Sequence, residues 1–290
     1  MKKQGTKTLW RVCFNDTGEF VHLFFEEVYD DENTLVVEEN GRIVSALQLL
    51  PYTLAFKRNE IPVAYICGVS THPESRGKGY MSQLMKEAED VLKQRNIPLA
   101  FLIPANHGLF ELYRRFDYKE AFWYATETYS MNKTQTGSCA RISIAEVTAS
   151  GLFPYFDKKL RERTAGMLHN EKDFMVIRKD LVLSRGKLLV ASNVRNEVTG
   201  MAFTLPDEEK KTAYITELLY DNSSIKDQLL YATAELYHVS EVKYQVQPDS
   251  SNVHPKGMAK VIDENYFKER NIDIQTLFTE KEGYLTLMLD

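Results

Sequence analysis

The sequence predicts an α/β protein with mixed sheets, built from one α/β unit that occurs twice along the chain. Residues 61–71 are an apolar, β-branched run that leads through a glycine turn into an amphipathic helix. Residues 98–105 form a second apolar run, and a parallel pairing of the two runs would make the helix between them a crossover. The pattern of residues 33–105 then returns over residues 186–249, which predicts a second copy of the unit.

Length, composition and charge exclude several classes of protein. The chain has 290 residues, 43% hydrophobic and 27% charged, which suits a globular protein of two domains. A net charge of -5 argues against a general nucleic-acid binder. The 3 cysteines show no metal or disulfide spacing, and we find neither a secretory signal nor a run of transmembrane length. We therefore expect a cytoplasmic protein with no metal site and no nucleic-acid or membrane partner.

The first fifty-odd residues predict two helices followed by a hairpin. Residues 9–28 carry apolar side chains at helical intervals, and the polar segment 15–18 interrupts them. Strands are expected over 33–40 and 42–57, because Asn40-Gly41 between them is a strong hairpin signal.

The turn at residues 76–79, Arg-Gly-Lys-Gly, carries the clearest chemical signal. It precedes a helix whose apolar face includes Met81, Leu84, Met85, Ala88, Val91 and Leu92. At a helix start the backbone N–H groups point outward, the glycines admit an anion, and Arg76 and Lys78 add positive charge. The favoured ligand is a phosphate or pyrophosphate. The alternative is a solvated basic turn, and the spacing fits neither a Walker A loop nor a dinucleotide fingerprint.

The rest of the first copy and the whole second copy follow from the same patterns. A helix is expected over 107–116 and a strand over 120–131, and the polar segment 132–139 reads as a linker. The second copy is expected as a hairpin, a strand, a helix and a strand over residues 186–206, 211–223, 224–238 and 241–249. Where the first copy has its glycine turn, the second has residues 225–228 without glycine, so we expect no phosphate site there.

The segment from Arg76 to Met81 resembles motif A of the GNAT superfamily of N-acetyltransferases, Arg/Gln-x-x-Gly-x-Gly/Ala, which binds the pyrophosphate of coenzyme A. Met81 departs from the usual small residue, but is similar to the enhanced-intracellular-survival (Eis) branch. Residues 104–118 resemble the motif B region, with Asp117 in place of the usual glycine. Two motifs in the right order strengthen the resemblance. It implies two tandem copies of the acyl-CoA N-acyltransferase (GNAT) fold, the second degenerate.

Three segments are expected on this basis: a catalytic domain over 1–133, a degenerate second domain over 134–255 and a C-terminal extension over 256–290. Residues 257–267 resemble the start of the sterol-carrier-like third domain of Eis-type proteins, but too few residues follow for that domain. We expect the tail, 276–290, to form a hairpin-like extension of the second domain. In Eis-type relatives the terminal carboxylate reaches the active site, and the sequence leaves open whether Asp290 does so.

The resemblance implies direct attack of a primary amine on the thioester of acetyl-CoA. The residues it assigns to the cofactor are Val69, Ser70, Thr71, Arg76, Gly77, Lys78, Gly79, Tyr80, Met81, Ser82, Ala105 and Asn106. Tyr113 takes the general-acid position, although packing in the core is the alternative for a residue on this apolar helix face. Glu26 and Glu27 are candidate bases through water, the alternative being a solvated acidic helix end.

Other residues and activities stay as alternatives. Cys67, His72 and His107 lie near the expected site, but a cysteine in an apolar strand is usually inert and lone histidines beside turns usually cap or face solvent. A coenzyme A binding or sensing module without turnover is the alternative function. The sequence leaves open the acceptor amine and whether the chain forms a homo-oligomer, although Eis-type relatives assemble into rings.

Overall fold

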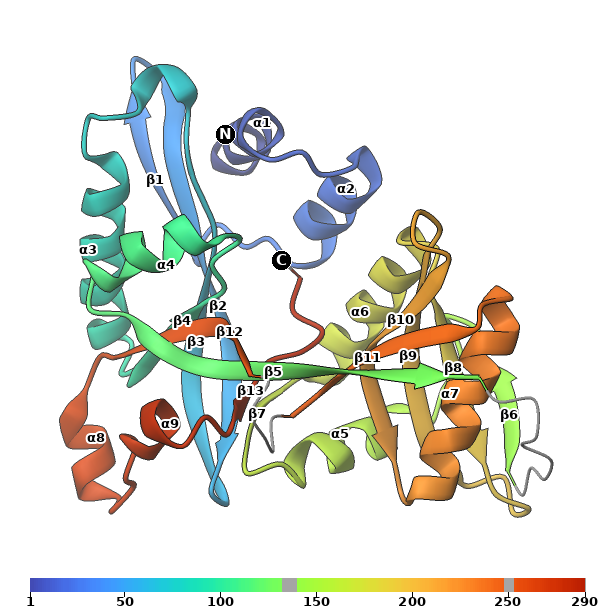
Figure 1. The fold of residues 1–290 in the computed structure, drawn as a ribbon. Helices are drawn as coiled ribbons and strands as arrows, with labels where there is room; N and C mark the ends of the chain where they lie inside the picture. Colours follow the sequence, from blue (N-terminus) through green and yellow to red (C-terminus); the bar gives the residue numbers. More distant parts are fainter. Residues whose placement is uncertain (132–139, 248–252, 290) are drawn as a thin grey trace. The chain divides into compact units, whose positions relative to one another are not determined.

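The computed structural model describes residues 1–131, 140–247 and 253–289, which fall into two units (Figure 1). The first unit contains Met1–Phe122 and Pro255–Gly283, and the second contains Trp123–His254 and Tyr284–Leu289. The expected linker at 132–139 and the carboxylate of Asp290 lie outside the described residues.

Two helices open the first unit, as the sequence predicts. α1 (Lys2–Cys13) and α2 (Gly18–Glu27) are separated by the polar break, and Thr17 caps α2 by accepting a hydrogen bond from the Phe20 N–H. The ring of Trp10 packs against the ring of Phe24, with centroids 4.6 Å apart, and so joins the two helices.

The first unit's sheet has strand order β1-β2-β3-β4-β12. Its strands are β1 (Thr34–Glu39), β2 (Arg42–Phe56), β3 (Asn59–Thr71), β4 (Leu99–Leu102) and β12 (His254–Val261). The β1–β2 and β2–β3 pairs are antiparallel, and Asn40 and Gly41 both have positive φ, as the tight hairpin turn requires. β3 and β4 are parallel, and α3 (Tyr80–Gln94) connects them. This is the predicted crossover.

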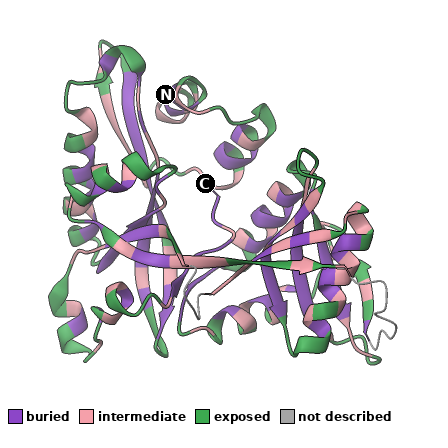
Figure 2. Ribbon diagram, in the orientation of Figure 1, coloured by how far each residue is buried: buried purple, intermediate pink, exposed green. Residues whose placement is uncertain are grey.

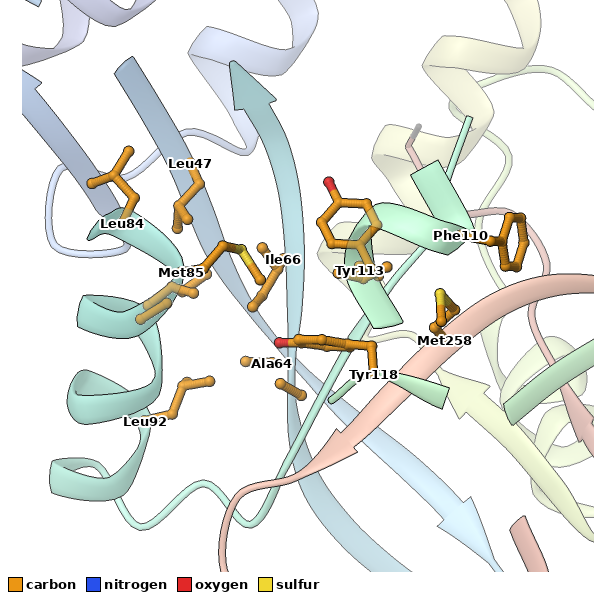
Figure 3. Close-up of a cluster of buried hydrophobic side chains, with 14 residues drawn as sticks. Leu47, Ala64, Ile66, Leu84, Met85, Leu92, Phe110, Tyr113, Tyr118 and Met258 are labelled. Atoms are coloured by element: carbon orange, nitrogen blue, oxygen red, sulfur yellow. The ribbon is translucent and has the colours of Figure 1, made fainter. Parts of the chain in front are cut away.

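One face of α3 supplies much of the first unit's core. Its buried residues Leu84, Met85, Ala88 and Leu92 pack in one cluster with side chains of β2 and β3, and the opposite face is exposed (Figures 2 and 3). α4 (His107–Arg114) follows β4 and adds Phe110 and Tyr113 to this cluster.

The second unit repeats the order of the first. β8 (Lys187–Ser192), β9 (Val198–Asp207) and β10 (Thr212–Tyr220) are successive antiparallel strands, and α7 (Ser223–Tyr237) leads to β11 (Glu241–Val246), which is parallel to β10. The repeat of one α/β unit expected from the sequence is therefore confirmed. The other elements are β6 (Arg141–Ile144), α5 (Phe153–Arg161), β7 (Ala165–Leu168) and α6 (Glu171–Leu183).

Each copy receives one strand from the other half of the chain. β5 (Lys119–Ser130) follows α4 of the first copy, but its residues from Ala125 onward pair antiparallel with β11 of the second unit. β12 follows the second copy, but its residues Met258–Val261 pair antiparallel with β4 of the first unit. The two halves thus exchange their last strands. The division therefore falls within β5 and not at the expected position 133/134.

The C-terminal segment also differs from the expected extension. Residues 255–283 belong to the first unit, where α8 (Glu264–Glu269) and α9 (Thr276–Thr279) follow β12. The tail contains α9 and the short strand β13 (Gly283–Tyr284), so it is not a hairpin. Among the described residues, no helix combines the length and apolar character needed to cross a membrane.

Candidate functional site

The strands β3 and β4 separate where the candidate site begins. Their parallel ladder runs only from Val63 and Leu99 to Tyr65 and Phe101, although β3 continues to Thr71 in register with β2. Beyond this point β3 has one ladder neighbour among the described strands, so its other edge is open to a ligand.

A β-bulge lies on this free length of β3. Cys67 is opposite Gln48 and Ser70 is opposite Ala46, so Gly68 and Val69 together face Leu47. A bulge leaves its extra residue unpaired and locally disrupts the hydrogen bonds of the ladder. Val69 is thus part of the bulge, and Ser70 and Thr71 follow it directly.

Gly68 is required at the bulge for two reasons. Its φ is +57°, in the left-handed region that favours glycine. A Cβ there would lie 2.0 Å from Gln48 Oε1 and 2.4 Å from Trp10 Cζ3. The bulge therefore depends on glycine and on close packing by α1.

The glycine turn forms the start of α3 with an open approach. Gly77 has φ +78° and Gly79 has φ +84°, and no atom lies within 4 Å of a Cβ built on either residue. Gly79 is the N-cap, and no side chain caps the helix. The first N–H groups of α3, from Tyr80 to Ser82, thus combine the positive end of the helix dipole with free space, the features of an anion site.

The basic and polar side chains of this turn already have protein partners. Lys78 Nζ lies 2.8 Å from Glu39 Oε1, and the Tyr80 hydroxyl donates to the same oxygen over 3.1 Å. These hydrogen bonds lower the pKa of Glu39. Arg76 Nε donates to the Thr71 carbonyl at 3.3 Å. The Glu39 carboxylate offsets the Lys78 charge, so an anion at this turn would depend chiefly on main-chain N–H groups.

The opposite side of the opening is the segment after β4. Ala105 and Asn106 are exposed there, and Asn106 caps α4 by accepting a hydrogen bond from the Leu109 N–H at 3.2 Å. The first unit therefore has two helix starts after its parallel strands, one capped by a side chain and one not.

Tyr113 lies on the buried face of α4. It is 6% exposed and belongs to the same core cluster as Tyr118, whose ring centroid is 6.2 Å away. Burial, followed by the nearby Cys67 thiol, raises the pKa of Tyr113 to about 12. Figure 3 shows the Tyr113 hydroxyl directed away from Tyr118. The residue thus packs in the core and also holds a protonated hydroxyl beside β3.

The two candidate bases lie at the end of α2. Glu26 is exposed, and its oxygens lie 3.2 Å from Lys3 Nζ and 4.0 Å from Lys7 Nζ on α1. Glu27 is half-buried. Two ammonium groups on α1 therefore already contact the Glu26 carboxylate.

The remaining candidates have structural surroundings. His72 is 8% exposed, lies 2.5 Å from Arg42 through Nε2, and accepts the Glu74 N–H through Nδ1. His107 is exposed at the first position of α4, and Cys67 is buried in β3. Within the described parts of the chain, no group of three or more His, Cys, Asp or Glu side chains could hold a metal ion.

Gln48 is a buried polar residue beside the bulge that sequence reasoning missed. Its side chain is fully buried against Gly68, and neither its amide nitrogen nor its amide oxygen has a hydrogen-bond partner among the described residues. Such buried polar atoms are costly and often functional. The only signal in the sequence is a glutamine inside the apolar run of residues 43–50.

The second copy keeps the strand geometry, but its helix begins differently. The β10–β11 ladder stops after Ile215 and Tyr244, and Thr216 is an extra residue opposite β9. At the start of α7, however, Asn222 accepts a hydrogen bond from the Ile225 N–H at 3.1 Å. The side chain of Asn222 thus caps one N–H group at the start of α7, whereas α3 has no side-chain cap.

A comparison with protein families finds a match for the first copy. Residues 2–121 match the family described as acetyltransferase (GNAT) domain. The first copy is a GNAT acetyltransferase domain. The chain is accordingly an acyltransferase that carries this domain in a tandem GNAT fold. No curated protein matches the sequence.

Solved structures share the GNAT fold over most of the chain. A probable N-acyltransferase of unknown function from Enterococcus faecalis has 17% identity and a TM-score of 0.76, covering 92% of this chain and 72% of its own. Eis1 from Mycobacterium abscessus has 12% identity and a TM-score of 0.66, covering 90% and 71%. A tandem GNAT protein from the clavulanic acid biosynthesis pathway has 10% identity and a TM-score of 0.53, covering 90% and 95%. At these identities the likeness concerns the fold alone.

Proposed function

We propose that the first copy is an acetyl-CoA-dependent N-acetyltransferase that acts on a primary amine. The observation that carries the proposal is the combination of an open β3 edge, a glycine bulge and an uncapped helix start in one GNAT domain. These features offer backbone donors to the thioester and to the pyrophosphate. The low cysteine content supports a cytoplasmic location.

In this proposal the cofactor follows the opening between β3 and the segment after β4. The N–H groups of residues 77–82 hold the pyrophosphate, and Val69, Ser70 and Thr71 bind the pantetheine arm and polarise the thioester carbonyl. Ala105 and Asn106 form the other wall. Lys78 and Tyr80 act mainly by fixing the turn through Glu39, since both already bond to that carboxylate.

The chemistry requires no covalent enzyme intermediate. The neutral amine forms a C–N bond to the acetyl carbon, the C–S bond breaks, and the proton of the amine leaves to water. A phenol with a pKa of about 12 stays protonated at neutral pH, and it is a weaker acid than a thiol, whose pKa is about 8.5. Tyr113 therefore stabilises the departing thiolate chiefly as a hydrogen-bond donor, and water supplies the final proton.

The decisive experiment measures free-thiol release from acetyl-CoA with a panel of amines, together with binding of coenzyme A. We expect amine-dependent thiol release from the wild-type protein. Gly79→Glu should lose cofactor binding by at least about 100-fold, because the side chain adds bulk and negative charge to the anion site. Unchanged coenzyme A affinity in this variant would refute the pyrophosphate assignment.

A coenzyme A binding or sensing module is the second candidate. It is favoured by the pairing of Glu26 with Lys3 and Lys7, which leaves one candidate base engaged. The same experiment distinguishes the two functions. Tight cofactor binding with no thiol release from any amine would support the module and contradict the enzyme.

A further inference from the structure

The second copy contains a cavity at the place where its own parallel strands separate. The cavity has a volume of about 360 Å³. Its walls come from the ends of β10 and β11, from α5 and from Tyr284, all within the second unit. This size is at the lower end of ligand pockets, which suits a small molecule.

Three side chains in the cavity wall have unused hydrogen-bonding capacity. Arg163 Nη2 lies 2.5 Å from Glu217 Oε1; the Glu217 side chain is 1% exposed and the Arg163 side chain 13%. Arg163 Nη1, Glu217 Oε2 and Gln245 Oε1 are buried without a hydrogen-bond partner within the described residues. Each such atom costs free energy unless a further group satisfies it. All three residues line the cavity, so a ligand that enters between them can satisfy one unused donor and two unused acceptors.

The charges around the cavity balance. Lys159, Arg163 and Lys226 face Glu127, Glu162 and Glu217 in its lining. The Arg163 guanidinium also lies 4.5 Å from the centroid of the Tyr284 ring, which holds it in place. A lining with equal numbers of both charges favours a ligand that is itself neutral overall and carries both signs.

Coenzyme A does not fit this cavity. The start of α7 is capped by Asn222 and has no glycine turn, so the second copy lacks a place for the pyrophosphate. A ligand here must instead use the strand ends and the Arg163–Glu217 pair.

From these observations we infer that the cavity of the second copy binds a free α-amino acid. The ligand carboxylate accepts from Arg163 Nη1, and its ammonium group donates to Glu217 Oε2 and Gln245 Oε1. Each unused atom then has a partner of the right kind, and no net charge is buried. This binding is independent of acetyl transfer in the first copy.

The test is a thermal-shift screen of the full-length protein with the twenty common amino acids, followed by calorimetric titration of the best ligand. A ligand of the folded state raises the midpoint in a concentration-dependent way. The matched decarboxylated amine and deaminated acid should each bind at least about tenfold more weakly, because each lacks one charged hydrogen-bond partner. The proposal would be overturned if the decarboxylated amine or the deaminated acid bound as tightly as the amino acid. It would also be overturned if no amino acid bound.

Two variants locate the binding site. The double variant Arg163→Met with Glu217→Leu replaces the ion pair by apolar residues. Such an exchange is often tolerated by the fold. We expect this variant to lose amino-acid binding. Gln245→Met is the milder variant if the double variant does not fold, and it should weaken binding by about tenfold. Gly79→Glu should leave amino-acid binding intact. Binding that survives the changes in the second copy, or is lost in Gly79→Glu, would place the amino acid elsewhere and refute the inference.

Discussion

The helix that connects the two parallel strands begins differently in the two copies. In the first, Gly79 leaves the N–H groups of α3 uncapped and open, whereas in the second the Asn222 side chain caps α7. The bulges differ as well, because the first uses Gly68 and the second has Thr216, followed by the buried Glu217. The same backbone plan therefore has two different local geometries, and a few residues at the strand end and helix start decide which one forms.

The largest effect is expected from Gly68→Ala, which tests the first bulge. The new Cβ would overlap Gln48 and the Trp10 ring at a positive φ, so we expect a loss of about 3 kcal/mol in the free energy of unfolding. Thiol release should fall below about one hundredth of the wild-type rate. Urea denaturation and the thiol assay measure both effects.

The matched change at the second bulge is Thr216→Ala. It removes a hydrogen bond of 3.3 Å to the Phe203 carbonyl, and we expect a cost of about 1 kcal/mol with no change in thiol release. Similar activity losses in both variants would show that the two bulges do not have separate roles.

Tyr113→Phe tests the hydroxyl beside β3. Removing the donor to the departing thiolate should lower kcat by about 100-fold and leave coenzyme A affinity unchanged. Tyr118→Phe is the matched control, because Tyr118 is buried in the same cluster and is assigned no chemical role. If kcat is undiminished in Tyr113→Phe, this tyrosine has only a packing role.

A pH effect is expected from the second copy. Burial lowers the pKa of His169 to about 4 from its usual value near 6.5. A depressed pKa gives stability that is present above about pH 6.5 and is lost as pH falls toward about 4. We expect the free energy of unfolding to drop by about 2 kcal/mol between about pH 7.5 and pH 5, and His169→Gln to remove much of this slope. A slope that persists in the variant would assign it to other groups.

Asn222→Ala should have a small effect, similar to that of Thr216→Ala. Loss of the cap on α7 costs about 1 kcal/mol of stability. Coenzyme A affinity should be unaltered, because the pyrophosphate site lies in the other copy. A change in affinity, measured by titration with the wild-type protein alongside, would contradict the assignment of the two helix starts.

Much of the fold could be predicted from sequence because its signals are local. The Asn40-Gly41 turn, the apolar face of α3 and the glycine turn each depend on neighbouring residues, and the structure has these elements close to the expected bounds. The roles of the expected site residues remain proposals. Their local placement, with Gly77 and Gly79 at a helix start and Tyr113 on a buried face, follows from spacing alone.

What sequence reasoning missed depends on contacts distant in the chain. Nothing within β5 or β12 indicates that each pairs with a strand of the other copy, because an antiparallel strand has the same alternation whichever partner it finds. α6 was not anticipated, and it carries Arg178 among its buried residues, which interrupts an apolar helical pattern. Gln48 and the Arg163–Glu217 pair are likewise recognised only once burial is known.

The exchange of β5 and β12 has a consequence for biosynthesis. The sheet of the N-terminal copy lacks its outer strand until the ribosome has delivered the residues up to Val261, although the domain begins at Met1. Neither half can therefore be completed, or cut free as an autonomous module, without a segment encoded in the other half.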